Sequence, residues 1–345
     1  MKDIFPEYYN LDKSELEKLW KECLFVFDAN VLLNLYRYSL ETSDNLIEIL
    51  NKVSDKIWIP HQFALEYQRN RLDVIEEQKL KYEKSVNTII SEFDIVRELF
   101  GNYFDKTPVD IDDIKNKLNE SLIEYPDSKS IDLLRDEIDV LFAGKIGDPF
   151  DVEQMQSVYK SGAYRYQRKT PPGYADATNK DKKDPTKEKK FGDLIGWLQI
   201  IEKAKSEGVP IIFITSERKE DWWQKVKSKT VGPRCELLIE FQKETSGKSF
   251  HMYDMKRFLE YAKKSIEIDE NTIDEVEKIE NVFNTPSIKD ELETASGFSV
   301  SEAVVFDDAF YSQQKDSAID DSADIEKESS VDSCATDIQN ESGKK

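Results

Sequence analysis

The chain has 345 residues, of which 39% are hydrophobic and 11% aromatic, enough apolar side chain for the core of one large domain. No apolar run approaches the roughly 20 residues that span a bilayer, and the N-terminal residues lack the basic-then-apolar pattern of a secretory signal, so we expect no membrane partner. The formal net charge of −21 argues against nucleic-acid binding at first sight, because phosphate groups favour basic surfaces.

The N-terminal part predicts two buried strands, each followed by a helix. Leu24–Phe27 is a short apolar run that ends at Asp28, as is typical of a buried parallel strand. Ser43–Val53 has helical apolar spacing, and Ile57–Ile59 is a second short strand. We expect the next helix to begin near Gln62.

The middle and C-terminal parts continue the alternation of helix and strand. Residues 72–143 hold charged stretches with helical spacing, which we interpret as a helical insertion, and the glycines and prolines of 144–190 predict an irregular loop. Asp193–Ala204 predicts an amphipathic helix, and Val209–Thr215 and Phe250–Tyr253 predict strands. Strands separated by helices indicate an α/β fold with a Rossmann-like parallel sheet.

The acidity of the chain belongs mainly to its C-terminal part. Residues 266–345 contain 22 Asp and Glu against 6 Lys and Arg, a net charge of −16, which leaves 48 acidic and 43 basic residues in 1–265, a net charge of −5. A composition so poor in apolar residues buries too little surface to offset the entropy of ordering. We therefore predict one domain over 1–265 and a largely disordered acidic tail over 266–345.

The cysteines and histidines carry no predicted chemistry. Cys23, Cys235 and Cys334 are widely spaced and form no CxxC pair, so we expect neither a disulfide framework nor a zinc site, and a reducing, cytoplasmic location. His61 and His251 lack metal-ligand spacing and are interpreted as structural.

Four carboxylates are predicted at one edge of the sheet. Asp28 ends the first strand, and Glu217 follows Thr215 directly after a later strand. Glu66 lies in the helix after the second strand, and Asp193 begins the helix that leads to the third. Ligands of open α/β sheets bind beyond the carboxyl ends of the strands, so these side chains form a candidate acidic site.

Clustered carboxylates suit the hydrolysis of phosphodiester bonds. The reaction needs a nucleophilic water and stabilisation of the leaving oxygen, and Mg²⁺ or Mn²⁺ bound by carboxylates supplies both. Each acid also has a structural alternative: Asp28 and Asp193 as helix caps, Glu66 as a solvated helix residue and Glu217 as a turn residue.

Several ordered motifs resemble those of PIN-domain nucleases. The sequence contains FDANVLLNLY, then IPHQFALEYQRNR, FGDLIGWLQI and IIFITSERKEDWW. It is most similar to a bacterial family of longer PIN-like proteins, because it adds RxxPPGYxD at Arg168–Asp176, GPRCEL at Gly232–Leu237 and FHMYDMKRFL at Phe250–Leu259. The similarity extends from about Leu24 to Leu259.

The resemblance implies a Rossmann-like sheet with an acidic two-metal cleft that binds Mg²⁺ or Mn²⁺ and cleaves single-stranded RNA or related structures. The acidic positions of the family fall on Asp28, Glu66, Asp193 and Glu217, the last being a Glu where the pattern has Asp. Further candidates are two reserve acids and two supporting residues: Asp221, Asp176, Asn30 and Thr215. A role in toxin action or phage defence is plausible for chains of this family.

A basic and aromatic region precedes the third acid and predicts a substrate-binding loop. Phosphate neutralisation combined with base stacking is the usual means of holding single strands. The predicted substrate-binding residues are Arg165, Arg168, Lys169, Tyr174 and Arg234. The alternatives are a flexible solvated loop for the lysine-rich part, and an ordinary ion pair for Arg234. Trp222 and Trp223 are predicted at the start of a helix, with core packing for at most one of them.

Two other function classes remain open on the sequence alone. One is a catalytically inactive nucleic-acid-binding or regulatory PIN-like module, for which Glu217 is the one departure from the pattern. The other is a metal-dependent phosphatase, although the DxD nucleophile pattern is replaced by Asp28-Ala29-Asn30. The acidic tail could also inhibit the enzyme by occupying the basic loop, and a protein partner could inhibit or activate it.

Overall fold

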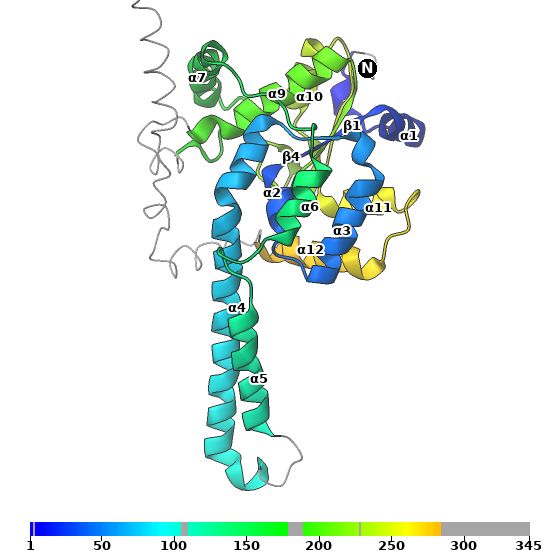
Figure 1. Cartoon of the computed structure of the whole chain (residues 1–345). Helices are drawn as coiled ribbons and strands as arrows, with labels where there is room; N and C mark the ends of the chain where they lie inside the picture. Colours follow the sequence, from blue (N-terminus) through cyan, green and yellow to red (C-terminus); the bar gives the residue numbers. More distant parts are fainter. Residues whose placement is uncertain (3, 105–109, 179–188, 228, 284–345) are drawn as a thin grey trace, which may run out of the picture. The chain divides into compact units, whose positions relative to one another are not determined.

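A four-stranded parallel sheet forms the centre of the protein (Figure 1). The computed structural model describes residues 1–2, 4–104, 110–178, 189–227 and 229–283. The strand order is β2-β1-β3-β6, and the strands are β1 (Leu24–Phe27), β2 (Ile57–Trp58), β3 (Ile211–Ile214) and β6 (Phe250–Tyr253). The predicted α/β class and parallel sheet are confirmed.

The register of the sheet brings the carboxyl ends of its three longer strands level with one another. Phe27 pairs with Ile214, which in turn pairs with Tyr253. The chain moves from β1 to β2 on one side, and later from β3 to β6 on the other. This reversal creates a topological switch point between β1 and β3, the place where open α/β sheets bind ligands.

Helices surround the sheet and extend beyond it. Those nearest the strands in sequence are α1 (Lys13–Glu22), α2 (Ala29–Asn34), α3 (Leu40–Lys52), α9 (Gly192–Glu207), α10 (Cys235–Glu244) and α11 (Met255–Ala262). The others are α4 (His61–Phe104), α5 (Ile111–Glu124), α6 (Leu133–Leu141), α7 (Val152–Gln167) and α12 (Glu270–Phe283). Short 3₁₀ turns lie at Pro6–Tyr8, Ser54–Lys56 and Lys189–Phe191.

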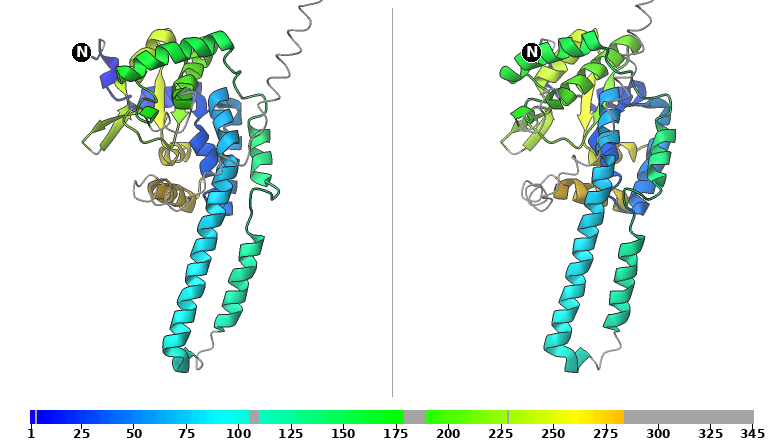
Figure 2. Two further views of the ribbon diagram at one scale, coloured as in Figure 1. Left: turned by 90° about the vertical axis from the view of Figure 1, so that its left-hand side faces the viewer. Right: turned by 60° about the vertical axis from the view of Figure 1, so that its left-hand side comes forward.

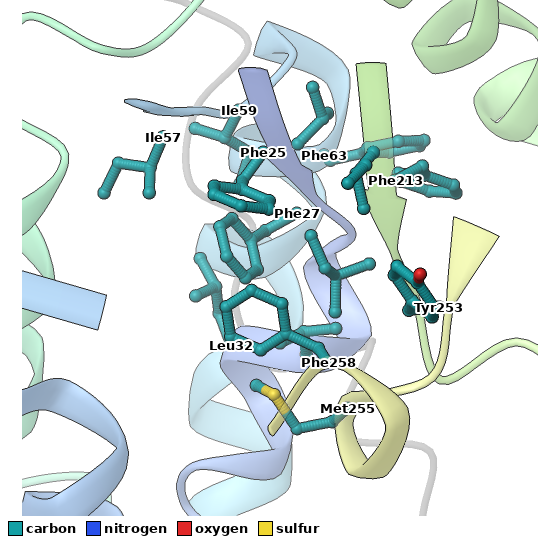
Figure 3. Packing of buried hydrophobic residues seen from close by; sticks show 14 of the residues in the cluster. Phe25, Phe27, Leu32, Ile57, Ile59, Phe63, Phe213, Tyr253, Met255 and Phe258 are labelled. Atoms are coloured by element: carbon teal, nitrogen blue, oxygen red, sulfur yellow. The ribbon is translucent and has the colours of Figure 1, made fainter. Parts of the chain in front are cut away.

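The core consists of apolar side chains from the strands and from the helices packed on them (Figure 3). Phe27 of β1 lies edge-on to Phe258 of α11, with 6.0 Å between ring centroids. Phe63 of α4 stacks on Phe213 of β3 at 5.8 Å. All four side chains are buried, so the strand ends that carry the candidate acids rest on a tightly packed base.

One glycine brings two site-bearing helices together. A Cβ atom at Gly196 of α9 would lie 2.2 Å from the ring of Phe63 on α4, a separation that real contacts do not allow. The missing side chain therefore lets α9 approach α4 closely. The consequence is that Asp193 on α9 and Glu66 on α4 come to the same region.

The predicted helical insertion forms a paired arm. Helix α4 continues from the sheet through 44 residues, with one non-helical residue at Phe100, and α5 lies beside it as the chain returns (Figures 1 and 2). At about 1.5 Å per residue the helix is roughly 66 Å long. The chain rejoins the sheet region where Ile59 and Ile146 form a parallel bridge.

Two segments differ from their predicted structure. The predicted irregular loop 144–190 contains helix α7, which begins with a capping box between Asp151 and Gln154, a local signal that outweighs the surrounding glycines and prolines. The predicted helix at Trp222 is instead an antiparallel hairpin of β4 (Trp223–Val226) and β5 (Lys229–Pro233). Trp222 and Trp223 are both buried, at 3% and 4% exposure. Trp222 packs on Trp197 and Phe213, and Trp223 Nε1 donates to the carbonyl oxygen of Glu217.

The folded unit extends past the predicted domain boundary at residue 265. Helix α12 packs against α3 and α11, and Ile273 and Val276 are buried in that contact. The helix is acidic on its exposed face, which is why its composition predicted a tail. The remainder of the predicted tail, from residue 284, lies outside the described residues. No helix in the described part of the chain is long and apolar enough to cross a membrane.

Candidate functional site

Asp28 lies at the carboxyl end of β1, directly at the switch point of the sheet. Its backbone N–H donates to the carbonyl oxygen of Ile214 at 3.0 Å, which fixes its place beside the end of β3. The side chain is 7% exposed. Its Oδ2 atom accepts a hydrogen bond from the Thr215 hydroxyl at 2.7 Å and one from Asn30 Nδ2 at 3.4 Å. Thr215 and Asn30 therefore both hydrogen-bond to Asp28.

The capping alternatives for two of the acids do not hold. Asp28 occupies the residue before α2 but makes no side-chain capping hydrogen bond. Asp193 is the second residue of α9, whose N-cap is Phe191. Asp28 is thus not used as a helix cap, and Asp193 does not occupy the N-cap position.

Four carboxyl groups share one neighbourhood. Burial, together with the nearby charges of Asp193 and Glu217, raises the pKa of Asp28 to about 6 against the opposing hydrogen bond from Thr215. Burial also raises the pKa of Asp221, and Asp193 and Glu217 again contribute. A positive charge placed among them would relieve this repulsion.

Glu66 approaches the same cluster from α4. A Cβ atom added to Gly192 would lie 4.0 Å from Glu66 Oε2, so the Glu66 carboxylate lies beside the residue that precedes Asp193. The Glu66 carboxylate on α4 thus lies near the start of α9, where Asp193 acts on the charge of Asp28.

Asp221 has a role that its sequence position does not reveal. Its Oδ2 atom accepts the backbone N–H groups of Gly173 and Ala175 at 2.9 and 3.0 Å. It therefore holds the turn formed by Pro171–Tyr174 against the site. Its Oδ1 atom is buried and has no hydrogen-bond partner within the described residues, which leaves one carboxylate oxygen available to a further ligand.

Gly173 is required for this turn. Its φ angle is +91°, a region that favours glycine. A Cβ atom there would lie 2.4 Å from the Tyr166 hydroxyl oxygen and 3.0 Å from Asp193 Cβ. The turn is thus packed directly on the third acid of the site.

Glu217 is turned toward its own loop and toward a lysine. Its Oε1 atom accepts the backbone N–H groups of Arg218 and Lys219 at 2.7 and 2.9 Å, which agrees with the turn-residue alternative. Its Oε2 atom lies 2.5 Å from Lys219 Nζ, and that ammonium also pairs with Asp176. Burial opposes the charge of Lys219, but the two carboxylates hold its pKa above the usual value.

The carboxylates of this site are the kind of ligand that Mg²⁺ and Mn²⁺ prefer, although their oxygens do not converge on a single point. Among the described residues, no three His, Cys, Asp or Glu side chains are already arranged to hold a metal ion. The crowded carboxyls and the buried Oδ1 atom of Asp221 fit a hard divalent cation. Glu217 would join such a cation only by sharing or releasing Lys219.

Comparison with protein families identifies the fold of this site. Residues 24–237 match the model of a family described as a PIN like domain, and this range covers more than half of the 345 residues. The chain belongs to the PIN-like domain family. Comparisons with curated proteins and with solved structures found no match.

The predicted substrate residues of the PIN-like domain divide into two groups. Arg165 forms a two-pronged ion pair with Glu240, with contacts of 2.5 and 2.8 Å, and also donates to the carbonyl oxygen of Pro171. Glu240 in turn accepts from Trp197 Nε1 at 2.8 Å. These contacts give Arg165 a structural role, because they hold the Pro171–Tyr174 turn to α10. Its contact with substrate stays a prediction.

The other basic candidates lie nearer the surface. Arg168 and Lys169 are exposed, and the Arg168 guanidinium lies 5.4 Å from the ring centroid of Tyr164, which is itself 60% exposed. Arg234 pairs with Glu236, as its structural alternative states. Arg234 also lowers the pKa of Tyr174, although burial of Tyr174 raises it more, so the two lie close together.

Three lysines on the β4–β5 hairpin were missed by sequence reasoning. Lys225, Lys227 and Lys229 are exposed, and none forms an ion pair with the rest of the described chain. The described residues between Trp223 and Cys235 include no acid. A segment with several lysines and no acid, within a strongly acidic chain, is a signal for a basic surface. The sequence prediction of a helix at this segment did not use that signal. Lys225 lies four residues after Asp221, so their Cα atoms are no more than about 15 Å apart.

The histidines of the PIN-like domain lie apart from this chemistry. Burial lowers the pKa of His251 to about 4 and also lowers that of His61, so both are neutral at pH 7. Cys23 is buried and Cys235 partly buried, both as free thiols; Cys334 lies outside the described residues.

Proposed function

We propose that this PIN-like domain is a metal-dependent endonuclease that hydrolyses phosphodiester bonds of single-stranded nucleic acid, with RNA the favoured polymer. The single observation that carries the proposal is the buried carboxyl of Asp28 at the switch point of the sheet, crowded by Asp193 and Glu217. Such a group is costly to leave charged without a cation. Members of the PIN-like family are usually nucleases, and the choice of RNA over DNA rests on that resemblance.

Mg²⁺ or Mn²⁺ would be held by Asp28, Glu66, Asp193 and Asp221, with Glu217 as a further ligand, and when bound it would activate water and stabilise the leaving oxygen. Thr215 and Asn30 orient Asp28 through hydrogen bonds to its Oδ2 atom. Asp221 holds the Pro171–Tyr174 turn through its Oδ2 atom and leaves Oδ1 for the cation.

Nucleic acid would be held by the exposed cations around this edge of the sheet. Arg168 with Tyr164 offers a charged and stacking surface, and the hairpin lysines offer three further positive charges. Positive charges neutralise phosphates and release counterions, and exposed aromatic rings stack on bases.

A non-catalytic nucleic-acid-binding module is the second candidate, and one observation favours it. Lys219 Nζ lies 2.5 Å from Glu217 and also pairs with Asp176, so an ammonium group already neutralises part of the acidic set. A lysine in that position can replace a cation permanently, which would leave binding without hydrolysis.

The deciding experiment is cleavage of labelled single-stranded RNA and DNA of one sequence, in Mn²⁺, Mg²⁺ or EDTA. The wild type is compared with Asp28→Asn and with Asp44→Asn, a control acid exposed on α3. We expect cleavage that needs the metal and falls at least about a hundredfold in Asp28→Asn, since even outer partners of metal sites cost 10 to 100-fold. Tight binding by the wild type without cleavage in any metal would support the binding module instead.

A further inference from the structure

The turn after β3 is held by helix α12. This turn, Thr215–Lys219, carries Glu217 and ends in the lysine that pairs with it. Helix α12 (Glu270–Phe283) lies beyond residues 24–237, the range that matches the family model. Its contact with the turn is therefore a feature of this chain beyond the matched PIN-like region.

Both neighbours of Glu217 are bound to α12. The Ser216 hydroxyl donates to Glu280 Oε1 at 3.0 Å, while Asn34 Nδ2 donates to the same Ser216 oxygen at 2.9 Å. On the other side of Glu217, Arg218 Nη1 donates to Asn281 Oδ1 at 3.0 Å, and Arg218 Nη2 lies 3.7 Å from Glu280 Oε2.

The helix is fixed to the protein independently of this turn. Glu275 accepts hydrogen bonds from the Ser39 and Thr42 hydroxyls, both at 2.9 Å, at the start of α3. Asn45 Nδ2 donates to the Thr272 hydroxyl at 3.0 Å. The turn is thus tied to a helix that has its own anchorage, so the links at Glu280 and Asn281 can set its position.

Packing alone does not require a carboxylate at residue 280. Glu280 is 2% exposed, and burial raises its pKa to about 7, with Asp254 adding to the effect. Burying such a group costs free energy that an apolar side chain of similar size would avoid. The carboxylate has two polar tasks: it accepts the Ser216 hydroxyl of the turn and the backbone N–H of Met255 at the start of α11.

We propose that Glu280 is a positioning residue, which acts through Ser216 and Arg218 to hold the turn that carries Glu217 in place beside Asp28. The inference rests on the proposed metal-dependent function of that acidic set. The C-terminal helix thereby becomes part of the machinery of the site, although it lies outside the family's matched region.

The test uses the full chain and four variants. Glu280→Ala removes the buried link, and Glu280→Gln retains an acceptor for the Ser216 hydroxyl. Asn281→Ala removes the second link from an exposed position and so keeps the test valid if Glu280→Ala does not fold. Glu275→Ala is the matched control, since it loosens α12 at α3 without touching the turn.

Three readouts are compared: the Mn²⁺ dissociation constant by electron paramagnetic resonance, hydrogen exchange of residues 215–219 in the metal-free protein, and the unfolding temperature. We expect Glu280→Ala to weaken Mn²⁺ binding about tenfold, in the range of losses for outer partners of metal sites. Exchange in 215–219 should rise as well, Asn281→Ala should show the same changes at smaller size, and Glu280→Gln should restore most of the affinity. Glu275→Ala should lower the unfolding temperature only.

The outcomes separate the inference from the proposed function. If the wild type binds Mn²⁺ and Glu280→Ala matches Glu275→Ala in affinity and in exchange at 215–219, the positioning role is refuted while the metal site stands. If the wild type binds no Mn²⁺, the proposed function fails, and with it the role of Glu280 in metal binding. Faster hydrogen exchange of 215–219 in Glu280→Ala alone would then show only that Glu280 holds the turn.

Discussion

Asp28→Asn should stabilise the metal-free protein at neutral and alkaline pH, although it should lower cleavage at least about a hundredfold. The Asp28 carboxyl is buried, and burial with the charges of Asp193 and Glu217 raises its pKa from 3.8 to about 6. In the unfolded chain the carboxyl has its ordinary pKa. Asparagine keeps an oxygen that can accept the Thr215 hydrogen bond but carries no charge.

The sign of the effect follows from proton binding. Between pH 4 and pH 6 the folded protein retains the Asp28 proton and the unfolded chain has lost it, so a rise in pH lowers the free energy of unfolding. A shift of about two pKa units at about 1.4 kcal/mol each gives a loss of about 3 kcal/mol, complete above pH 6. Asp28→Asn lacks this loss, since residue 28 no longer titrates.

The assay is urea unfolding in EDTA, followed by tryptophan fluorescence, at several pH values from 4 to 8. The measured quantity is the difference in unfolding free energy between Asp28→Asn and the wild type. It should grow by about 2–3 kcal/mol from pH 4 to pH 8, because most other titrations are common to both proteins. Added Mg²⁺ at about 100 times its dissociation constant should restore about 2.7 kcal/mol to the wild type alone.

A flat difference between pH 4 and pH 8 would refute the reasoning, since it would mean that Asp28 has an ordinary pKa in the folded protein. A variant less stable than the wild type at pH 8 would be equally contrary. Asp44→Asn provides the control, because Asp44 is exposed on α3 and its replacement should leave the pH dependence unchanged.

Two further predictions concern the substrate-binding edge and its turn. Replacing the hairpin residues Lys225, Lys227 and Lys229 by Ala should weaken binding of single-stranded RNA in EDTA and reduce the slope of log affinity against log salt by about 2, since each phosphate contact contributes about 0.7. The matched change of Lys13, Lys18 and Lys21 on α1, which leads into the amino end of β1, should leave the slope unchanged. Equal slopes in the two triple variants would exclude a hairpin contact. Gly173→Ala should destabilise the protein by about 1–3 kcal/mol in urea unfolding, because of its φ of +91° and the 2.4 Å approach to Tyr166. An unchanged midpoint would show that the turn does not depend on glycine.

The sequence by itself determined the sheet and most of its acidic edge. Short apolar runs such as Leu24–Phe27 and Ile211–Ile214 have no alternative to burial between helices. Their alternation with helices makes the strands parallel, and parallel strands place their carboxyl ends together. Asp28 therefore had to lie at the site edge once its strand was recognised, and its support by Thr215 follows from the neighbouring strand end.

Tertiary structure alone decided which polar partners each site residue has. From its sequence position, Arg165 is predicted to bind substrate. In the fold its guanidinium is paired with Glu240, which is 75 residues away. From its sequence position, Asp221 is predicted only as a reserve metal ligand. In the fold one of its oxygens also accepts N–H groups of the turn at Gly173. Such pairings depend on close packing between distant segments, and no local pattern encodes them.

The end of the folded domain, predicted at residue 265, was likewise decided by packing between segments that are distant in the sequence. Helix α12 is acidic and weakly apolar as a sequence, so its composition predicts an unfolded segment. It folds because Ile273 and Val276 are buried against α3 and α11, and because Glu275 and Glu280 find hydroxyl donors on other elements. The sequence determines which residues can be buried or charged, while the three-dimensional fold determines which of those charges face one another.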